Sequence, residues 1–512
     1  MIPPGLAKTG KVSFGNIIPR AHAKAETERG IAMSPLGILT AVITISTIVV
    51  GLVIVLENRN PSRTMTWLLI LIFVPIFGIF LYLYLGQNHR KKRTFIKKRK
   101  QDYRIIRRLL DNQIFVSDHS DLFTRRYNDV RGKVLPLMVN NGDAPLTANN
   151  RSHLLKSGET AFETMLKAIE SASHHVHMEY FIIKDSVIGR RFQQALIKKA
   201  REGISVRLIY DAVGSWRLSR RFLDEMREAG VEVKPFLKVL YPVILAHRLN
   251  YRNHRKLLVV DGRMGFTGGL NIGDEYLGKS PELGYWRDTQ VQIEGEAVYA
   301  LQVIFLRDWY FVSGQEIDDK IFFPRREHLG DQLIQVVSSG PDSLWASIHQ
   351  GYFMAITTAM QRVYICTPYL VPDESILVAL KTAALRGVDV RILLPGRPDH
   401  RTVFWASKSH FQELLEAGVR IFQYQKGFMH SKVVLVDDNF TSVGTTNMDI
   451  RSFDLNFEVN AFYYDEAITR QMSHDFFEDL ADSIEVSLEH HRQRPFIHRF
   501  KESAMRLLSP IL

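Results

Sequence analysis

The sequence predicts an α/β protein that contains one domain twice, preceded by a hairpin of two apolar helices. Two observations indicate the duplication. A motif of histidine, any residue, lysine, four further residues and aspartate occurs at His254 and again at His430. Apolar strands alternate with helical stretches in the same order before each copy, which is typical of α/β units. The hairpin is predicted by two uncharged runs of 21 residues each near the start of the chain.

The first 34 residues are polar and show no periodicity. They lack the compact basic and then apolar start of a signal peptide, so we expect a disordered leader. Met33 lies just before the first apolar run, and the sequence leaves open whether translation starts there. The single cysteine, Cys366, excludes internal disulfides and fits a reducing compartment.

Residues 36–56 and 65–85 are the two uncharged runs. At about 1.5 Å per residue, each is long enough to cross a bilayer core of roughly 30 Å. Pro75 and Gly78 are expected to kink the second helix, which helices in membranes tolerate. A short polar loop joins the runs, so residues 35–86 are predicted to form a transmembrane hairpin. A pair of soluble core helices is disfavoured by the length of both runs.

The net charge of +12 is concentrated in one segment. Residues 90–108 hold eleven Lys/Arg and one acidic residue, whereas the leader holds five basic residues and the hairpin loop two. The positive-inside rule therefore places both ends of the hairpin in the cytoplasm. The basic linker, residues 87–131, is expected to lie against anionic lipid, or to be a solvated helix that only stops transfer. Because the surplus lies beside the hairpin, no nucleic-acid partner is predicted.

The region after the linker consists of two matching halves. The apolar strand at 176–183 corresponds to one at 363–366, and residues 203–208 correspond to residues 387–392. The junction is expected near 322–335. We therefore predict domains at 132–328 and 329–512.

Each motif is predicted to form one strand of a buried hairpin. The four residues after Lys256 are all leucine or valine, as are those after Lys432, which indicates a strand buried on both faces. Residues two apart share a face, so each histidine and its lysine point the same way. Asp261 and Asp437 lie an odd number of residues from their histidines. They should face away and support the hairpin turns.

A two-residue turn is expected in both hairpins, pairing residue 261 with 264 and residue 437 with 440. Continuing each ladder would place Asn271 opposite His254, and Asn447 opposite His430. The sequence thus predicts two clusters that each contain a histidine, a lysine and an asparagine.

Such clusters suit chemistry at a phosphodiester. Lysine and asparagine donors can hold phosphoryl oxygens. One neutral imidazole can attack phosphorus, and the other, protonated, can supply the leaving alcohol with a proton. The motifs contain no nest of carboxylates, so no metal or other cofactor is expected. Two hairpins with incidental histidines are the plain alternative, which the matched second copy disfavours.

The two motifs resemble the duplicated signature of the phospholipase D superfamily. That resemblance implies duplicated phospholipase D-like domains, each a mixed sheet flanked by helices, that share one metal-independent site working through a phosphohistidine. It also implies an acidic residue downstream of each histidine that orients it. Glu458 matches in the second half, and Asp288 is its counterpart in the first, farther from its histidine. The candidate site therefore comprises His254, Lys256, Asp261, His430, Lys432 and Asp437, supported by Asn271, Asn447, Asp288 and Glu458.

From the apolar hairpin to its last residues, the chain resembles the bacterial cardiolipin synthases. The resemblance implies a multi-pass enzyme of the bacterial plasma membrane that condenses two phosphatidylglycerol molecules into cardiolipin and glycerol, with anionic lipid as its partner. We take His254 as the attacking group. Another phosphatidyltransferase or a phospholipase is the alternative, whereas a membrane-tethered nuclease and an inactive scaffold are disfavoured. Acyl-chain preference and oligomeric state do not follow from the sequence.

Two apolar segments remain open to two interpretations. Residues 239–246 form either a core strand or part of an entry path for acyl chains. Residues 495–508 alternate apolar and basic side chains, which predicts an amphipathic helix that lies at a membrane interface or packs on the domain.

Overall fold

The computed structural model describes residues 34–56, 61–82, 98, 127–142, 144–237, 250–317, 320–325 and 328–509. The chain divides into two compact units, Met1–Leu83 and Tyr84–Leu512. The expectations for the leader with Met33, for the basic segment apart from Lys98, and for residues 239–246 concern residues outside those described.

The first unit is a pair of apolar arms. Helix α1 (Pro35–Leu56) is, within the described residues, the one helix long and apolar enough to cross a membrane, with a mean hydropathy of 2.8. The second arm consists of two shorter helices, α2 (Pro61–Phe73) and α3 (Pro75–Leu81). Val74 between them has φ −139° and ψ 68°. A residue before proline is disfavoured in the helical region, so Pro75 breaks the arm where a kink was expected.

The two arms pack against each other. Ile54 of α1, Leu71 of α2 and Tyr82 beyond α3 form a buried apolar cluster. Trp67 meets the Tyr82 ring edge-on, with 5.4 Å between ring centroids. The first unit is therefore a helical hairpin in which the second arm is divided.

The strand pairings give the second unit two mixed sheets with the same strand order. The first sheet pairs its first three strands in parallel and the rest antiparallel. Its order is β4 (Glu232–Phe236), β3 (Ser205–Asp211), β2 (His175–Tyr180), β6 (Lys256–Val260), β7 (Met264–Gly268), β8 (Tyr285–Glu294) and β1 (Thr147–Ser157).

The second sheet repeats this arrangement with the same strand directions. Its order is β13 (Arg420–Tyr424), β12 (Asp389–Pro395), β10 (Arg362–Cys366), β15 (Val433–Val436), β16 (Phe440–Gly444), β18 (Asn456–Tyr463) and β9 (Gln332–Ser339). Strand β19 (Ser483–Glu485) extends its edge beside β13, and β1 also pairs with β9. The predicted duplicated α/β fold is confirmed.

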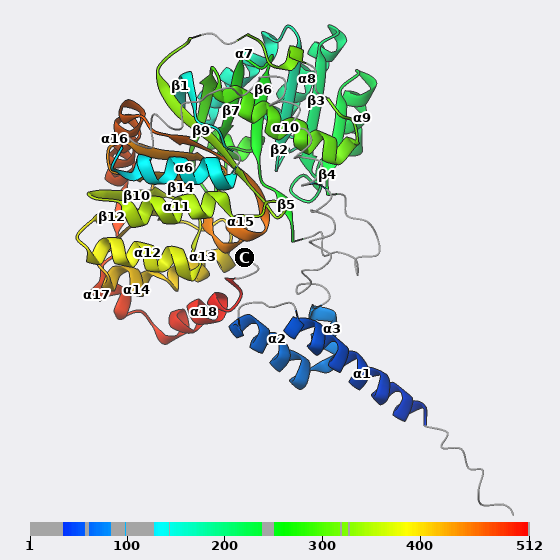
Figure 1. Ribbon diagram of the computed structural model, residues 1–512, viewed down its shortest axis with the longest axis vertical. Coiled ribbons are helices and arrows are strands. Elements are labelled where there is room, and N and C mark those ends of the chain that lie inside the picture. The colour runs from blue at the N-terminus through cyan, green and yellow to red at the C-terminus, as the bar shows by residue number, and fades with distance from the viewer. Residues whose placement is uncertain are drawn as a thin grey trace, which may run out of the picture. The chain divides into compact units, whose positions relative to one another are not determined.

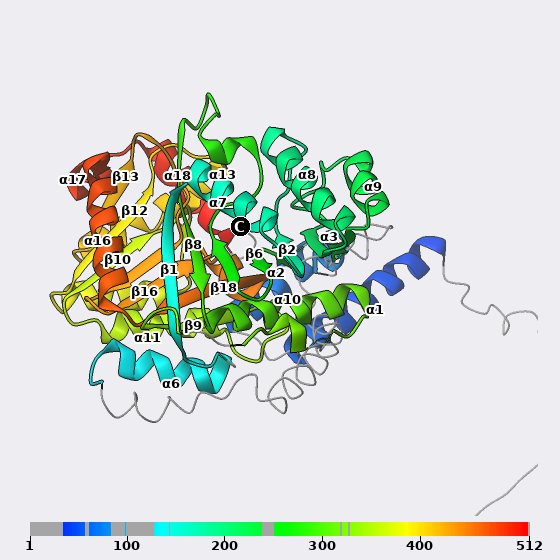
Figure 2. The same ribbon diagram turned by 90° about the horizontal axis from the view of Figure 1, so that it is seen from above.

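Helices and sheets alternate in layers (Figures 1 and 2). The outer face of the first sheet is covered by α7 (Gly158–Glu170), α8 (Val187–Arg201) and α9 (Arg220–Glu228). The outer face of the second sheet is covered by α11 (Ser347–Thr358), α12 (Glu374–Leu385) and α14 (Phe411–Glu416). Between the sheets lies a shared core to which α10 (Ala297–Ser313) and α16 (Glu466–Ala481) contribute.

The layering explains the apolar run in each motif. Leu257 faces the shared core, whereas its neighbour Leu258 faces the helices on the outer side. Val433 and Val434 alternate in the same way in the second half. Both faces of these strands are buried, as their unbroken apolar sequences predict.

One helix departs from the expected division into two domains. Helix α6 (Val130–Gly142) precedes the first half in the chain, yet Val134 and Met138 belong to the outer core of the second half. Figure 2 shows α6 beside α11. The second half is thus completed by a helix that comes before the first.

The C-terminal helix α18 (Phe496–Arg506) has features of both interpretations of residues 495–508, packing on the domain and an open apolar side. It packs on the domain, where Arg506 pairs with Glu413 at 2.9 Å. Phe496 and Phe500 remain exposed. The helix therefore lies on the domain and keeps an apolar side open.

The expected two-residue turns are wrong. Val260 pairs with Met264 and Val436 with Phe440, so each turn holds three residues. The cause is local, because Asp261 and Asp437 take the left-handed conformation, with φ 54° and 52°. The extra residue shifts both ladders by one, so the asparagines do not lie opposite the histidines.

Both aspartates support the turns. The Asp261 carboxylate accepts hydrogen bonds at 2.8 Å from the backbone amides of Ser173, His174 and His175. Asp437 accepts the corresponding amides of residues 360–362 at distances from 2.8 to 3.2 Å. Each aspartate therefore ties its hairpin to the loop before the neighbouring central strand.

Replacing Asp261 or Asp437 by asparagine should lower the free energy of unfolding by about 1–3 kcal/mol, because three backbone amides lose a charged acceptor. Denaturant unfolding monitored by circular dichroism measures this. Asp438→Asn is the matched control, since Asp438 pairs with Arg362 at the surface, where ion pairs contribute little. An Asp437→Asn protein as stable as the control would contradict the assignment.

Candidate active site

The two motifs begin at strands that pair with the opposite half. His254 follows β5 (Arg252–Asn253), which runs parallel to β18 of the second half. His430 follows β14 (Gly427–Met429), which runs parallel to β8 of the first half. The His254 amide donates to the Phe457 carbonyl at 2.9 Å, and the His430 amide to the Arg287 carbonyl at 2.7 Å. Backbone pairing therefore inserts each histidine into the other half.

The carboxylates are exchanged in the same way. His254 Nδ1 lies 2.9 and 3.0 Å from the two oxygens of Glu458, and His430 Nδ1 lies 2.7 Å from Asp288 Oδ2. We expected Glu458 to serve the histidine of its own half, and Asp288 likewise. That expectation is wrong, because β5 and β14 cross between the halves.

Both carboxylates are held rigidly and ionised. Glu458 also accepts the Thr445 hydroxyl at 2.5 Å, and Asp288 accepts the Thr289 amide at 2.8 Å. Burial acts to raise the pKa of each carboxyl, but the facing histidine and lysine outweigh it and hold both pKa values below the ordinary range. An ionised carboxylate at Nδ1 fixes the proton on that nitrogen, which leaves Nε2 of each ring with a lone pair.

Both imidazoles are neutral at pH 7. Burial lowers the pKa of His254 to about 4 against the opposing effect of Glu458. Burial, aided by Lys432, lowers the pKa of His430 to about 4 against the effect of Asp288. A neutral imidazole with a free Nε2 is a competent nucleophile.

The lysines are fully buried beside the histidines. Lys256 Nζ donates to the His254 carbonyl at 2.8 Å, and Lys432 Nζ donates to the His430 carbonyl at 2.6 Å. Burial lowers the pKa of Lys256 to about 7 and that of Lys432 to about 8. The charge of Lys432 also acts on His254, and that of Lys256 acts on His430. The two motifs therefore form one site.

The asparagines differ between the halves. The Asn271 side chain is engaged, since its oxygen accepts the Ile182 amide at 3.2 Å and its nitrogen donates to the Tyr276 hydroxyl at 2.9 Å. Asn447 is 6% exposed, and its Oδ1 has no hydrogen-bond partner within the described part of the chain. Neither side chain makes a hydrogen bond to its histidine among the contacts of the described residues.

Aromatic rings that the sequence analysis missed enclose both histidines. Phe181 lies 5.0 Å from the His254 ring, and the Lys256 ammonium lies 5.4 Å from the Phe181 centroid. Trp286 and Phe428 lie 5.0 and 5.8 Å from the His430 ring. These rings exclude water and strengthen electrostatic interactions in the site. One signal was present, because Trp286 stands two residues before Asp288.

A buried ionic network supports the first motif and corrects one expectation. Lys98, in the basic segment expected at the lipid surface, is 1% exposed and pairs with Asp308 at 3.0 Å and Asp342 at 2.8 Å. Asp308 also pairs with Arg255, whose Nε donates to the Glu458 carbonyl at 3.2 Å. This cation therefore lies beneath the site instead of on lipid. Nothing in the local sequence distinguishes it from its basic neighbours.

A possible metal-ligand set lies on α16. Among the described residues, His474, Asp475 and Glu478 place ligand atoms within 4.8 Å of one another. Lys156 forms ion pairs with Asp475 and, at 3.3 Å, with Glu478. None of the three contacts either motif, so they add nothing to the chemistry of the histidines.

Comparison with known proteins agrees with this geometry. A family model described as "Cardiolipin synthase, PLD-like domain" matches residues 165–309 and 352–480, and an N-terminal phospholipase D-nuclease model matches residues 41–87. Cardiolipin synthase 2 of Bacillus cereus is 46% identical over 92% of this chain and 90% of its own length. The major cardiolipin synthase of Bacillus subtilis is 42% identical over 94% of this chain and its full length.

Among solved structures, the phosphatidylserine synthase of Haemophilus influenzae superposes with a TM-score of 0.57 at 14% identity. The match covers 74% of this chain and all of that one, and it shows a common fold. Given the two family-model matches and the relatives of 42–46% identity, the chain belongs to the cardiolipin synthase family of the phospholipase D superfamily.

Proposed function

We propose that the protein is a cardiolipin synthase that transfers a phosphatidyl group from one phosphatidylglycerol to another. The observation that carries this proposal is the buried site in which two neutral histidines each face a carboxylate from the opposite half. Relatives named cardiolipin synthase, similar over almost the whole chain, support the substrate.

In the first step, His254 Nε2 attacks the phosphorus of the donor lipid. The bond from phosphorus to the headgroup oxygen breaks, His430 supplies the proton, and glycerol leaves. Lys256 and Lys432 hold the phosphoryl oxygens. His430 takes up this proton from solvent when the substrate binds, because the anionic phosphate raises the pKa of the nearby imidazole, and releases a proton when the product leaves.

In the second step, the headgroup hydroxyl of a second phosphatidylglycerol attacks the phosphatidyl-histidine. Neutral His430 now takes the hydroxyl proton, the bond from phosphorus to nitrogen breaks, and cardiolipin forms. Both histidines return to their starting states, and no outside reactant is consumed. Transfer prevails over hydrolysis because the histidines and lysines are at least nine-tenths buried.

We further propose that the first unit anchors this site to its substrate. Helix α1 and the divided arm α2–α3 would cross the plasma membrane together, with the second unit in the cytoplasm. The apolar length of α1 and the eleven basic residues that follow the hairpin support this topology.

Incubation of the purified full-length protein with labelled phosphatidylglycerol should yield cardiolipin and glycerol in equal amounts, identified by mass spectrometry. The His254→Ala protein is the control and should yield neither. Phosphatidic acid as the sole lipid product would instead establish a phospholipase.

The assignment of His254 can be tested with a donor whose leaving group is p-nitrophenol, which departs without a proton. His430→Ala should then accumulate a covalent lipid adduct, detected by intact-protein mass spectrometry, because it keeps the nucleophile but lacks the base for the second step. His254→Ala should form no adduct. An adduct on His254→Ala alone would show that His430 is the nucleophile and that His254 is the acid and base.

The rate should fall as the pH rises through the lysine pKa values. Lys256 and Lys432 lose their charge near pH 7 and pH 8, and the neutral amines attract phosphate less. The ratio kcat/KM, which reports the free enzyme, should therefore decline from pH 7 to pH 9. The substrate phosphodiester does not titrate in this range. A flat profile up to pH 9.5 would show that the lysines are not needed in their charged form.

A further inference from the structure

The two halves differ at the sheet edge beside the motifs. Glu179 and Cys366 pair with the first apolar residues after the motif lysines, so Ile182 and Tyr369 occupy equivalent positions. The connection from Arg207 to its partner Glu232 on the next strand is four residues shorter than the connection from Arg391 to Arg420. The longer connection of the second half carries the titratable side chains of Asp399 and His400.

Tyr369, Asp399 and His400 form a connected cluster. The Tyr369 hydroxyl donates to Asp399 Oδ2 at 2.5 Å, and His400 Nδ1 lies 2.9 Å from the same oxygen. The His400 amide donates to Asp399 Oδ1 at 2.7 Å. In the first half the Ser215 hydroxyl is already engaged, because it accepts the Ile183 amide and donates to the Phe181 carbonyl.

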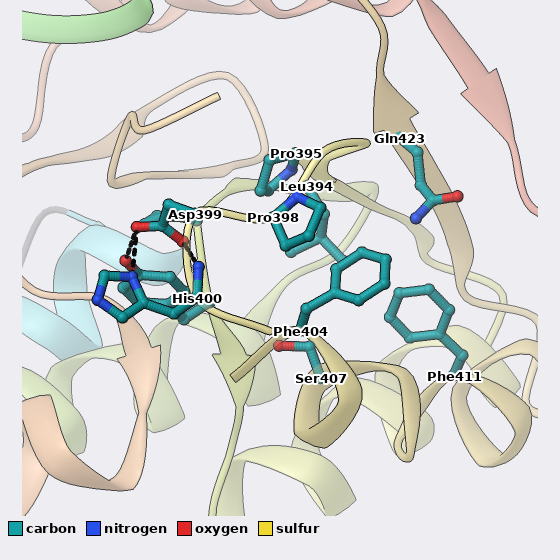
Figure 3. A pocket seen from close by; sticks show the side chains of 11 residues that line it. Leu394, Pro395, Pro398, Asp399, His400, Phe404, Ser407, Phe411 and Gln423 are labelled. Atoms are coloured by element: carbon teal, nitrogen blue, oxygen red, sulfur yellow. Dashed lines mark hydrogen bonds and ion pairs between the residues drawn. The ribbon is translucent and has the colours of Figure 1, made fainter. Parts of the chain in front are cut away.

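The cluster forms the polar end of a pocket (Figure 3). Pro398, Phe404 and Phe411 line its apolar part. The pocket thus presents oxygen acceptors at one end and carbon surface at the other. The cavity volume of about 20 Å³ admits one small group, and a hydroxyl on a carbon chain matches the combination of acceptors and carbon surface.

The cluster lies next to the second motif. Leu370 pairs with Met448, so the residues preceding them, Tyr369 and Asn447, are neighbours across the same short ladder. Asn447 carries the buried oxygen that has no partner within the described residues. The imidazole of His430 is one of the groups that, against the effect of burial, hold the pKa of Asp399 below its ordinary value.

The charge balance selects a neutral ligand. The Asp399 carboxylate disfavours phosphate, and the Tyr369 hydroxyl and His400 Nδ1, which face one of its oxygens, make it less available to a cation. What the cluster offers is acceptors, namely Asp399 Oδ1, Tyr369 Oη and Asn447 Oδ1. Hydroxyl donors satisfy such acceptors.

We infer that Tyr369, Asp399 and Asn447 form a subsite for the hydroxyl groups of the glycerol headgroup. This subsite rests on the proposed function and extends it. It holds the leaving glycerol in the first step and the attacking headgroup in the second. Both lie on the His430 side of the phosphorus, where His430 gives and then takes the proton. An in-line displacement then requires attack from the opposite side, which is the side of His254.

The test uses the full-length Tyr369→Phe and Asp399→Asn proteins. Each should raise KM for phosphatidylglycerol roughly tenfold, because each removes a hydrogen bond to the headgroup, while kcat changes far less. Tyr364→Phe is the matched control. Its hydroxyl donates to Asp389 at 2.9 Å at the other end of the same strands, away from the motifs.

A second measurement is independent of the fraction of folded protein. Cardiolipin is incubated with glycerol, ethanolamine or propan-1-ol as the attacking alcohol, and the ratio of the products is measured for each enzyme. Wild type and Tyr364→Phe should prefer glycerol strongly, and the other two variants should lose most of that preference. A wild-type preference for ethanolamine, or an unchanged product ratio in both variants, would overturn the subsite. If wild type makes no cardiolipin from phosphatidylglycerol, the proposed function itself fails, whatever the variants do.

Discussion

The hydrogen bond between each histidine and a carboxylate of the opposite half is the constraint on which the site depends. It fixes the proton on Nδ1 and keeps the carboxylates ionised in a buried place. Burial otherwise works against every charge in this region, as the lowered pKa values of Lys256 and Lys432 show. Neither half contains a complete catalytic group, so the duplicated domains act only as a pair.

Local sequence was sufficient for much of this description. The strands after Lys256 and Lys432, the structural role of Asp261 and the break at Pro75 all follow from short-range preferences of the chain. The exchange of Glu458 and Asp288 could not be predicted, because it depends on pairing between strands about 140 and about 200 residues apart. The turn register failed for a smaller reason, the left-handed conformation of a single aspartate in each hairpin.

Duplication gives two nearly equivalent histidines, whereas the proposed reaction needs them to act differently. Their surroundings within the motifs do not separate them, since burial lowers both pKa values to about 4. The difference lies outside the motifs, in the loops that follow β3 and β12. In the second half this loop places Asp399 and His400 beside Tyr369, whereas in the first half Ser215 is hydrogen-bonded to the backbone of Phe181 and Ile183. The two histidines have similar surroundings, and the loops beside them, which differ between the halves, give them different roles.

The position of α6 has a consequence for biosynthesis. This helix leaves the ribosome before the first half, but α11, the partner that covers its apolar face, begins about 200 residues later. At roughly 5–20 residues per second, the face waits on the order of ten seconds or more for its partner. During that interval the nascent chain exposes Val134 and Met138. The half that is made last therefore completes a helix that is made before either half, and a chain released early would expose an apolar surface to chaperones.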